Sequence, residues 1–200
     1  MAGYTKSVER LQAEFVKLPG IGARSAERLA FHILKATEDE ALALADAIRD
    51  VKANVRPCAQ CFNLAESELC AVCSDPRRDT DVICVVEQPK DVLSLEATGA
   101  YNGLYHVLMG QIAPLEGTGP EDLTIDALLE RVKHGSVREV IMATNPTVTG
   151  DATALYIIEQ LKAFPTVSVT RLARGLPAGG SIELASKSIL SDAMSERRKL

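Results

Sequence analysis

Four of the chain's five cysteines stand close together in "CAQCFNLAESELCAVC", residues 58–73. They form two C-x-x-C pairs, Cys58 with Cys61 and Cys70 with Cys73. Each pair supplies two ligands from one tight turn, and the loop between the pairs brings them together. Four thiolates at this spacing suit a closed tetrahedral site, for which Zn²⁺ is the default metal and a structural role the usual one. The spacing therefore predicts a small four-cysteine zinc finger.

An iron–sulfur cluster and a thioredoxin-like redox pair are the alternatives for these thiols. A redox C-x-x-C is expected near the N-terminus of a helix within a βα unit, and neither pair lies in such a place. The fifth cysteine, Cys84, lies inside an apolar run and is predicted to be an ordinary core residue.

A second pattern with chemical meaning is "LPGIGARSAERLAFHIL", residues 18–34, which has the h-x-G-h-G form of a helix-hairpin-helix. Gly20 and Gly22 permit a tight turn and the close approach of a phosphate to the backbone. The next helix then directs its free N–H groups at that phosphate, and Arg24 and Arg28 add charge on one face. The pattern predicts contacts to the DNA backbone that read no bases. The alternative is a helical hairpin used only for packing or dimerisation.

The third candidate is Glu87, which directly follows the apolar run "VICVV" at 82–86. Functional groups of an open α/β sheet collect beyond the carboxyl ends of its strands. Glu87 with Asp151 is a possible Mg²⁺ site, or Glu87 is a partner site. Catalysis needs more convergent carboxylates than this chain offers, so no catalytic residue is predicted. The interpretation we favour is that Glu87 caps the sheet or pairs with a neighbour such as Lys90.

The elements that must position these residues begin with helices. Apolar residues three and four apart predict a helix before the glycine turn and another after it. A third helix is predicted to start at Thr37, where T-x-x-E forms a capping box with Glu40. The apolar faces run through Val8, Leu11, Phe15 and Leu18, then Ala26, Leu29, Ala30 and Ile33, then Leu44, Ile48, Val51 and Val55.

After the cysteines, short apolar runs rich in β-branched residues alternate with helical stretches. The runs are 82–86, 104–108, 139–143 and 167–172, and the helical stretches lie near 90–98, 124–133 and 151–163. This alternation predicts a parallel sheet covered on both faces. The fold class is therefore α/β with several domains. We expect a helix-hairpin-helix for DNA binding or oligomerisation at 1–56, a zinc finger at 57–76, the parallel-sheet domain at 80–175, and a C-terminal loop and tail at 176–200.

Charge and hydropathy limit the partners. The net charge of −5 is unevenly spread, because residues 1–56 hold nine Lys and Arg against eight Asp and Glu, while the other 144 residues hold thirteen against nineteen. DNA binding should therefore belong to the N-terminal part, and one copy should bind weakly. The start of the chain has no apolar signal segment, and no run approaches the about 18 apolar residues of a membrane span. We expect a soluble cytoplasmic protein with no membrane partner, in which clustered cysteines bind metal.

The order of these blocks resembles the RecR family of bacterial recombination mediators. The resemblance rests on the hairpin, the four-cysteine knuckle, "VVEQPKDVLSLE", "ATNPTVTGDATALY" and "TRLARGLPAGG", and it covers nearly the whole chain. It implies that the sheet is a Toprim domain. Catalytic Toprim domains carry a Glu after the first strand, matched by Glu87, and a D-x-D after a later one. Here the later stretch is "TNP", Thr144 to Pro146, with no paired aspartates.

The resemblance also implies a function in DNA repair and recombination. It implies a ring-like homo-oligomer, a tetramer, that acts with RecO and RecF to load recombinase at gapped DNA without being an enzyme. The alternatives are a Mg²⁺-dependent Toprim enzyme, such as a nuclease or primase-like transferase, and a redox or regulatory zinc-knuckle protein. With four Tyr, four Phe and no Trp, none of them clustered in the hairpin, the chain offers no stacking platform for single strands. Duplex DNA or a single/double-strand junction is the expected target.

Overall fold

The computed structural model describes residues 4–197. The first three and last three residues, which belong to the expected N-terminal domain and C-terminal tail, lie outside this range. The chain divides into two compact units, one up to Val55 and one from Arg56 onward. None of the helices in the described range is long and apolar enough to cross a membrane.

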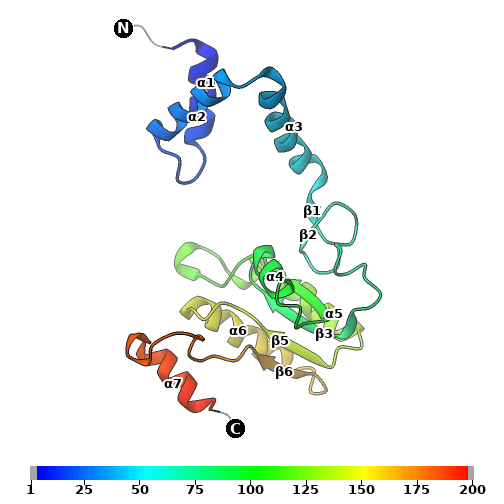
Figure 1. Ribbon diagram of the computed structural model, residues 1–200. Helices are drawn as coiled ribbons and strands as arrows, with labels where there is room; N and C mark the ends of the chain where they lie inside the picture. The colour runs from blue at the N-terminus through cyan, green and yellow to red at the C-terminus, as the bar shows by residue number, and fades with distance from the viewer. Residues whose placement is uncertain (1–3, 198–200) are drawn as a thin grey trace. The chain divides into compact units, whose positions relative to one another are not determined.

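The first unit consists of the three expected helices, α1 (Lys6–Val16), α2 (Ala23–Lys35) and α3 (Glu38–Asn54). Helices α1 and α2 pack against each other as a hairpin (Figure 1). The capping box of α3 is confirmed. The Thr37 N–H donates to Glu40 Oε2 at 2.9 Å, and the Glu40 N–H donates to Thr37 Oγ1 at 3.3 Å. These bonds satisfy two backbone donors that a helix start leaves free.

The apolar stripe of helix α3 is exposed to solvent. None of its residues is buried within the described chain, and the exposed large side chains are Leu42, Leu44, Ile48 and Val51. A stripe of this kind normally packs against another element. The helix is therefore available to a partner surface.

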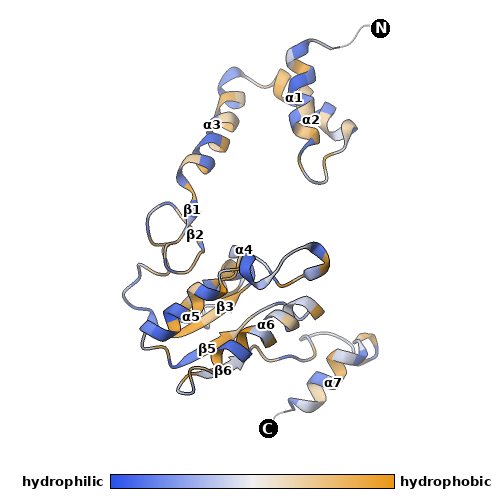
Figure 2. Cartoon of the chain, turned by 180° about the vertical axis from the view of Figure 1, so that it is seen from behind, coloured by the Kyte–Doolittle hydropathy of each residue, from blue (hydrophilic) through white to orange (hydrophobic). Residues whose placement is uncertain are grey.

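The second unit is built on a parallel sheet in the order β4-β3-β5-β6. Figure 2 shows hydrophobic residues along β3 and β5, the two central strands. The prediction of a parallel α/β sheet is confirmed. The strands are β3 (Asp79–Val86), β4 (Gly103–Val107), β5 (Glu139–Met142) and β6 (Ser168–Arg171), and the helices α4 (Pro89–Glu96), α5 (Ile125–His134) and α6 (Val148–Leu161) connect them.

Alternate residues of β3 enter two separate cores, as a strand that is covered on both faces requires. Ile83 and Val85 pack in one core with residues of α5 and α6. Cys84 and Val86 pack in the other core, which includes Val92 of α4. The strand is thus buried on both faces, which explains why its sequence reads as a continuous apolar run. Cys84 is 3% exposed, which confirms its prediction as a core residue.

The cysteine-containing segment belongs to this second unit and contributes to its core. Cys58, Cys61 and Cys70 are buried in the same cluster as Val86 and Val107. The segment also protects the free edge of β4, because the Val107 N–H donates to the Cys61 carbonyl at 2.8 Å. It contains a two-residue antiparallel pair, β1 (Arg56–Pro57) with β2 (Leu64–Ala65). Strands this short carry no readable period, so the sequence did not predict them.

The C-terminal segment is more structured than the expected loop and tail. It contains a 3₁₀ turn at Ile182–Leu184 and a helix, α7 (Lys187–Ser195). Ser186 caps this helix by accepting a hydrogen bond from the Ile189 N–H at 3.3 Å. The loop between β4 and α5 also forms two short 3₁₀ turns, Pro114–Glu116 and Pro120–Asp122.

Candidate metal centre and nucleic-acid interface

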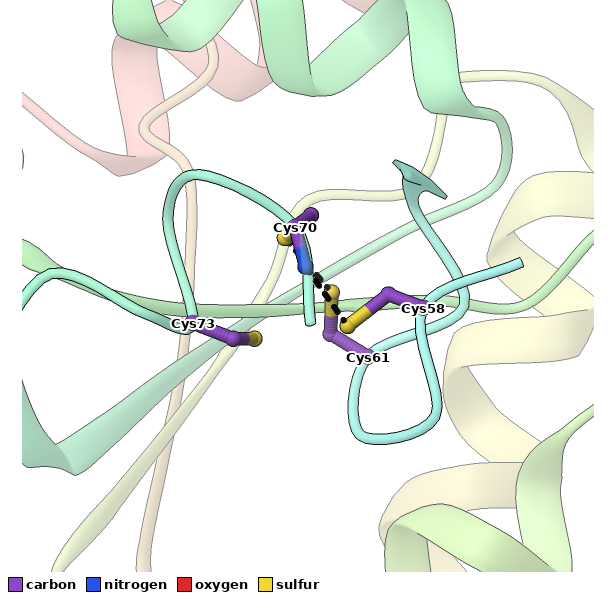
Figure 3. A group of neighbouring side chains, drawn as sticks. All are labelled: Cys58, Cys61, Cys70 and Cys73. Carbon is purple, nitrogen blue, oxygen red and sulfur yellow. Dashed lines mark hydrogen bonds between the residues drawn. The ribbon is translucent and has the colours of Figure 1, made fainter. Parts of the chain in front are cut away.

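The four predicted metal ligands come together in the folded chain. The Sγ atoms of Cys58, Cys61, Cys70 and Cys73 all lie within 4.8 Å of one another. Figure 3 shows the two pairs facing each other from two separate loops. Cys58, Cys61 and Cys70 are buried, and Cys73 is half-buried. This is the arrangement that a closed site for one metal ion requires.

Backbone hydrogen bonds shape each of the two knuckles. In the first, the Cys58 N–H donates to the Asn63 carbonyl at 2.7 Å, and the Phe62 N–H donates to the Cys58 carbonyl at 3.0 Å. Phe62 adopts a left-handed conformation with φ of 63°, which closes the turn. In the second, the Ser74 N–H donates to the Cys70 carbonyl at 3.0 Å. The Cys70 N–H also donates to Cys58 Sγ at 3.3 Å, which links the two knuckles.

Because the thiols lie close together, their pKa values differ from one another. Hydrogen bonding from Cys73 is the largest of the effects that lower the pKa of Cys61 to about 5. The hydrogen bond to Cys61 and burial raise the pKa of Cys73, and burial raises the pKa of Cys70. The Cys61 thiolate therefore forms readily, and a metal ion must displace protons from Cys70 and Cys73. A donor set of four thiols with no carboxylate fits zinc.

The glycine turn and its arginines have the expected geometry in the N-terminal unit. Gly20 has φ of +78°, a left-handed conformation that favours glycine. Gly22 is the N-cap of α2, so the free N–H groups of that helix begin directly after the turn. Arg24 and Arg28 are exposed. Ala26 and Ala30 are the residues of this helix that are buried. The exposed side chains of Arg24 and Arg28 are therefore accessible to a ligand.

Glu87 does not meet Asp151 in a metal site. Glu87 is 5% exposed, and its carboxylate accepts hydrogen bonds from the backbone and side chain of Asn145. Asp151 pairs with Arg171 and Arg174 instead. Between residues 4 and 197, the cysteine cluster is the only group of His, Cys, Asp and Glu side chains arranged for a metal ion. The prediction that Glu87 pairs with Lys90 was wrong, because its hydrogen-bond partner is Asn145.

Comparison with known proteins identifies the family. The family model for the RecR helix-hairpin-helix matches residues 8–52, that for the RecR zinc finger domain with four cysteines matches 55–75, and that for the Toprim domain matches 81–173. The chain is 56% identical to "Recombination protein RecR" of Rhodopirellula baltica over 200 residues, which is all of both chains. The chain belongs to the RecR family.

Further RecR relatives support the assignment. The Rubrobacter xylanophilus protein is 55% identical over 200 residues and all of both chains. The Chloroflexus aurantiacus protein is 55% identical over 193 residues, 96% of this chain and 94% of the relative. Membership of RecR confirms the predicted combination of hairpin, zinc finger and Toprim sheet, and it confirms the prediction of a non-enzymatic protein. The exact domain boundaries and the DNA-contacting residues stay predictions.

Sequence reasoning missed two polar residues beside the RecR zinc finger, the buried His106 and the half-buried Arg131. His106 of β4 is fully buried, and its Nε2 lies 2.9 Å from the Thr124 carbonyl. Arg131 of α5 donates from Nη1 to the Tyr105 carbonyl at 2.8 Å and lies 3.2 Å from His106 Nδ1. The ring of Phe62 packs edge-on against the ring of His106, and the two ring centroids are 5.4 Å apart. The only signal in the sequence was a histidine inside an otherwise apolar strand.

Proposed function

We propose that this chain is a non-enzymatic, DNA-binding recombination mediator in recombinational DNA repair. It acts in the cytoplasm with RecO and RecF to load recombinase at gapped DNA. The observation that carries the DNA-binding part is the position of Arg24 and Arg28. Both are exposed on α2, next to a left-handed glycine turn and the free N–H groups of a helix start. Such a helix start binds anions through its backbone and dipole, and the arginines add phosphate contacts.

Binding by one copy is weak, because residues 1–56 carry nine basic against eight acidic side chains. Several copies around a shared DNA path would add their phosphate contacts at high effective concentration. The exposed apolar stripe of α3 supports assembly, since Leu44, Ile48 and Val51 have no buried partner within the described chain. We therefore propose a homo-oligomer, most simply a tetramer, as the DNA-binding form.

The zinc finger has a structural role in this proposal. Cys58, Cys61, Cys70 and Cys73 hold the ion, and all four coordination positions are taken by protein thiolates. No position is left for a reacting water, which catalysis at zinc would need. The ion instead stabilises the knuckles that pack on the edge of β4.

The alternative of a Mg²⁺-dependent Toprim enzyme has little support at Glu87. Both of its carboxylate oxygens accept hydrogen bonds from Asn145. Asp151, the other carboxylate considered, is paired with arginines. A metal ion there would have to displace these contacts before it could bind.

The double variant Arg24→Glu with Arg28→Glu tests the proposed DNA path. We expect loss of binding to a gapped duplex, and in wild type a salt slope of about −0.9 per phosphate contacted. The matched control is Arg49→Glu with Lys52→Glu, which makes the same charge change on exposed positions of α3. Equal affinity and equal salt slope in wild type and the Arg24/Arg28 variant would place the DNA path elsewhere.

The partner proposal is tested separately. Purified RecO and RecF, each titrated against the full-length chain without DNA, should bind both wild type and the Arg24/Arg28 variant. Oligomer mass measured by light scattering should be unchanged by that variant. Absence of binding to either protein would overturn that partnership while leaving the DNA result intact.

A further inference from the structure

The four-cysteine site concentrates negative charge in a partly apolar environment. Four thiolates around one Zn²⁺ carry a net charge of about −2. Three of the four cysteines are buried in a cluster that contains Val86, Tyr105 and Val107. Buried charge is costly unless an opposite charge or hydrogen-bond donors lie nearby. The Cys70 N–H, which donates to Cys58 Sγ, is one such donor. A nearby cation would compensate more of the charge.

Arg131 is a half-buried cation that lacks a carboxylate partner. Its Nη1 donates to the Tyr105 carbonyl at 2.8 Å and lies 3.2 Å from His106 Nδ1, both of which are neutral acceptors. Among residues 4–197, no carboxylate oxygen lies within ion-pair distance of Arg131. The adjacent Glu130 pairs with Lys133 and His134 instead. Within the described residues, no carboxylate therefore balances the charge of Arg131.

The first knuckle of the zinc finger and Arg131 of α5 line the same surface cavity. A surface cavity of about 560 Å³ is lined on one side by Gln60 and Phe62 of the first knuckle and on the other by Arg131. The rings of Phe62 in the first knuckle and His106 in β4 also pack edge-to-face, with their centroids 5.4 Å apart. Burial lowers the pKa of Arg131, and the thiolates of the cysteine cluster act in the opposite direction.

We propose that Arg131 is a positioning residue for the zinc finger and the counter-charge of its thiolates. The Tyr105 carbonyl and His106 fix its guanidinium on the sheet side of the knuckles. From there its positive charge offsets part of the net negative charge of the four zinc-bound thiolates. Retention of zinc is thereby coupled to the folded Toprim sheet. A detached finger segment would keep its ligands but lose this cation.

Zinc release from the full-length protein tests the proposal. The variant is Arg131→Gln, which removes the charge but keeps a polar side chain with a shorter N–H donor. The measurement is the rate of zinc transfer to the chelating dye 4-(2-pyridylazo)resorcinol. We expect release to be faster by about tenfold or more, the range seen when an outer-shell partner of a metal site is lost. The matched control is Lys133→Gln, an exposed cation on the same helix, which should release zinc at the wild-type rate.

The conservative variant Arg131→Lys separates charge from packing. It keeps the cation but loses the planar guanidinium that bonds the Tyr105 carbonyl. Zinc retention close to wild type in this variant, with fast release in Arg131→Gln, supports the counter-charge. Zinc loss as fast in Arg131→Lys as in Arg131→Gln would overturn it, because packing would then be the cause. Unchanged release in Arg131→Gln would overturn it as well. If Arg131→Gln does not fold, Arg131→Lys is compared with Lys133→Gln instead, and zinc release about tenfold faster in Arg131→Lys would overturn the proposal.

Discussion

The carboxylate of Glu87 is held on both oxygens by Asn145. The Asn145 backbone N–H donates to Oε1 at 2.9 Å, and its side-chain Nδ2 donates to Oε2 at 2.6 Å. Glu87 follows β3 and Asn145 lies beyond β5, the next strand of the sheet. The contact ties together the carboxyl ends of two neighbouring parallel strands, at the edge where α/β proteins usually place function. In this chain the acid is part of the loop's own structure.

Glu87→Ala should therefore fold but lose stability. The reason is that the buried Glu87 carboxylate accepts two hydrogen bonds from Asn145. Loss of the two hydrogen bonds that Asn145 donates to the buried Glu87 carboxylate should lower the free energy of unfolding by about 1–3 kcal/mol. Urea unfolding measures this change. The exposed carboxylate variant Glu116→Ala should differ from wild type by less than about 0.5 kcal/mol. A variant with wild-type stability, or a wild-type melting temperature that Mg²⁺ raises through Glu87, would contradict the assignment.

Gly150→Ala should disturb the same contact from the other side. A Cβ at Gly150 would lie 2.7 Å from Glu87 Oε1 and closer still to the Asn145 carbonyl, which is backbone and cannot move freely. We expect destabilisation of about 1–3 kcal/mol, the usual cost of overpacking. Gly175→Ala is the matched control, because a Cβ there meets nothing within 4 Å. Equal melting temperatures for the two variants would mean that the loop around Asn145 moves without cost.

Gly20→Ala tests the hairpin turn. A side chain at φ of +78° is strained by about 1–2 kcal/mol, although a Cβ there meets no other atom within 4 Å. If the turn relaxes to relieve about 1 kcal/mol, affinity for a gapped duplex should fall about fivefold. Gly22→Ala is the control for added size alone, because Gly22 has φ of −85° and open space around it. Filter binding of both variants at one salt concentration measures the difference. Equal affinities would separate the turn geometry from DNA binding.

His106 should make stability depend on pH. Burial, with the nearby Arg131 charge, lowers the pKa of His106 to about 3 from an ordinary value near 6.5. The unfolded chain therefore binds a proton between these values that the folded chain does not. The stabilisation is complete above about pH 6.5 and is lost as the pH falls toward 3. At pH 5 this histidine alone should cost about 2 kcal/mol relative to pH 7.5.

The variant His106→Gln isolates that contribution, because glutamine stays neutral at every pH. Urea unfolding at pH 7.5 and pH 5 should show a smaller difference in the variant than in wild type. Zinc content is measured at both pH values, so that metal loss is counted separately. The same pH dependence in both proteins would show that His106 is not the group responsible.

Much of this protein is determined by local sequence. The two C-x-x-C pairs, the glycine turn and the Thr37 capping box each specify their own structure over a few residues, and each has the predicted geometry. The apolar runs of β3 and β4 likewise predict strands buried on both faces, because such strands must be apolar at nearly every position. The edge strand β6 is mostly exposed, so there the prediction of a sheet covered on both faces was wrong. These features depend on residues close together in the chain.

Only the tertiary structure decided the contacts made across long separations. Asn145 rather than Lys90 binds Glu87, because parallel pairing brings the ends of β3 and β5 together across 58 residues. The zinc finger packs on β4 through Cys61 and Val107, although the sequence suggested a separate small domain. Arg131 lies on α5, which reads as an ordinary amphipathic helix, and it lines one cavity with Gln60 and Phe62 of the finger. No local period encodes such contacts, since they arise when burial brings distant polar groups together and each must find a partner.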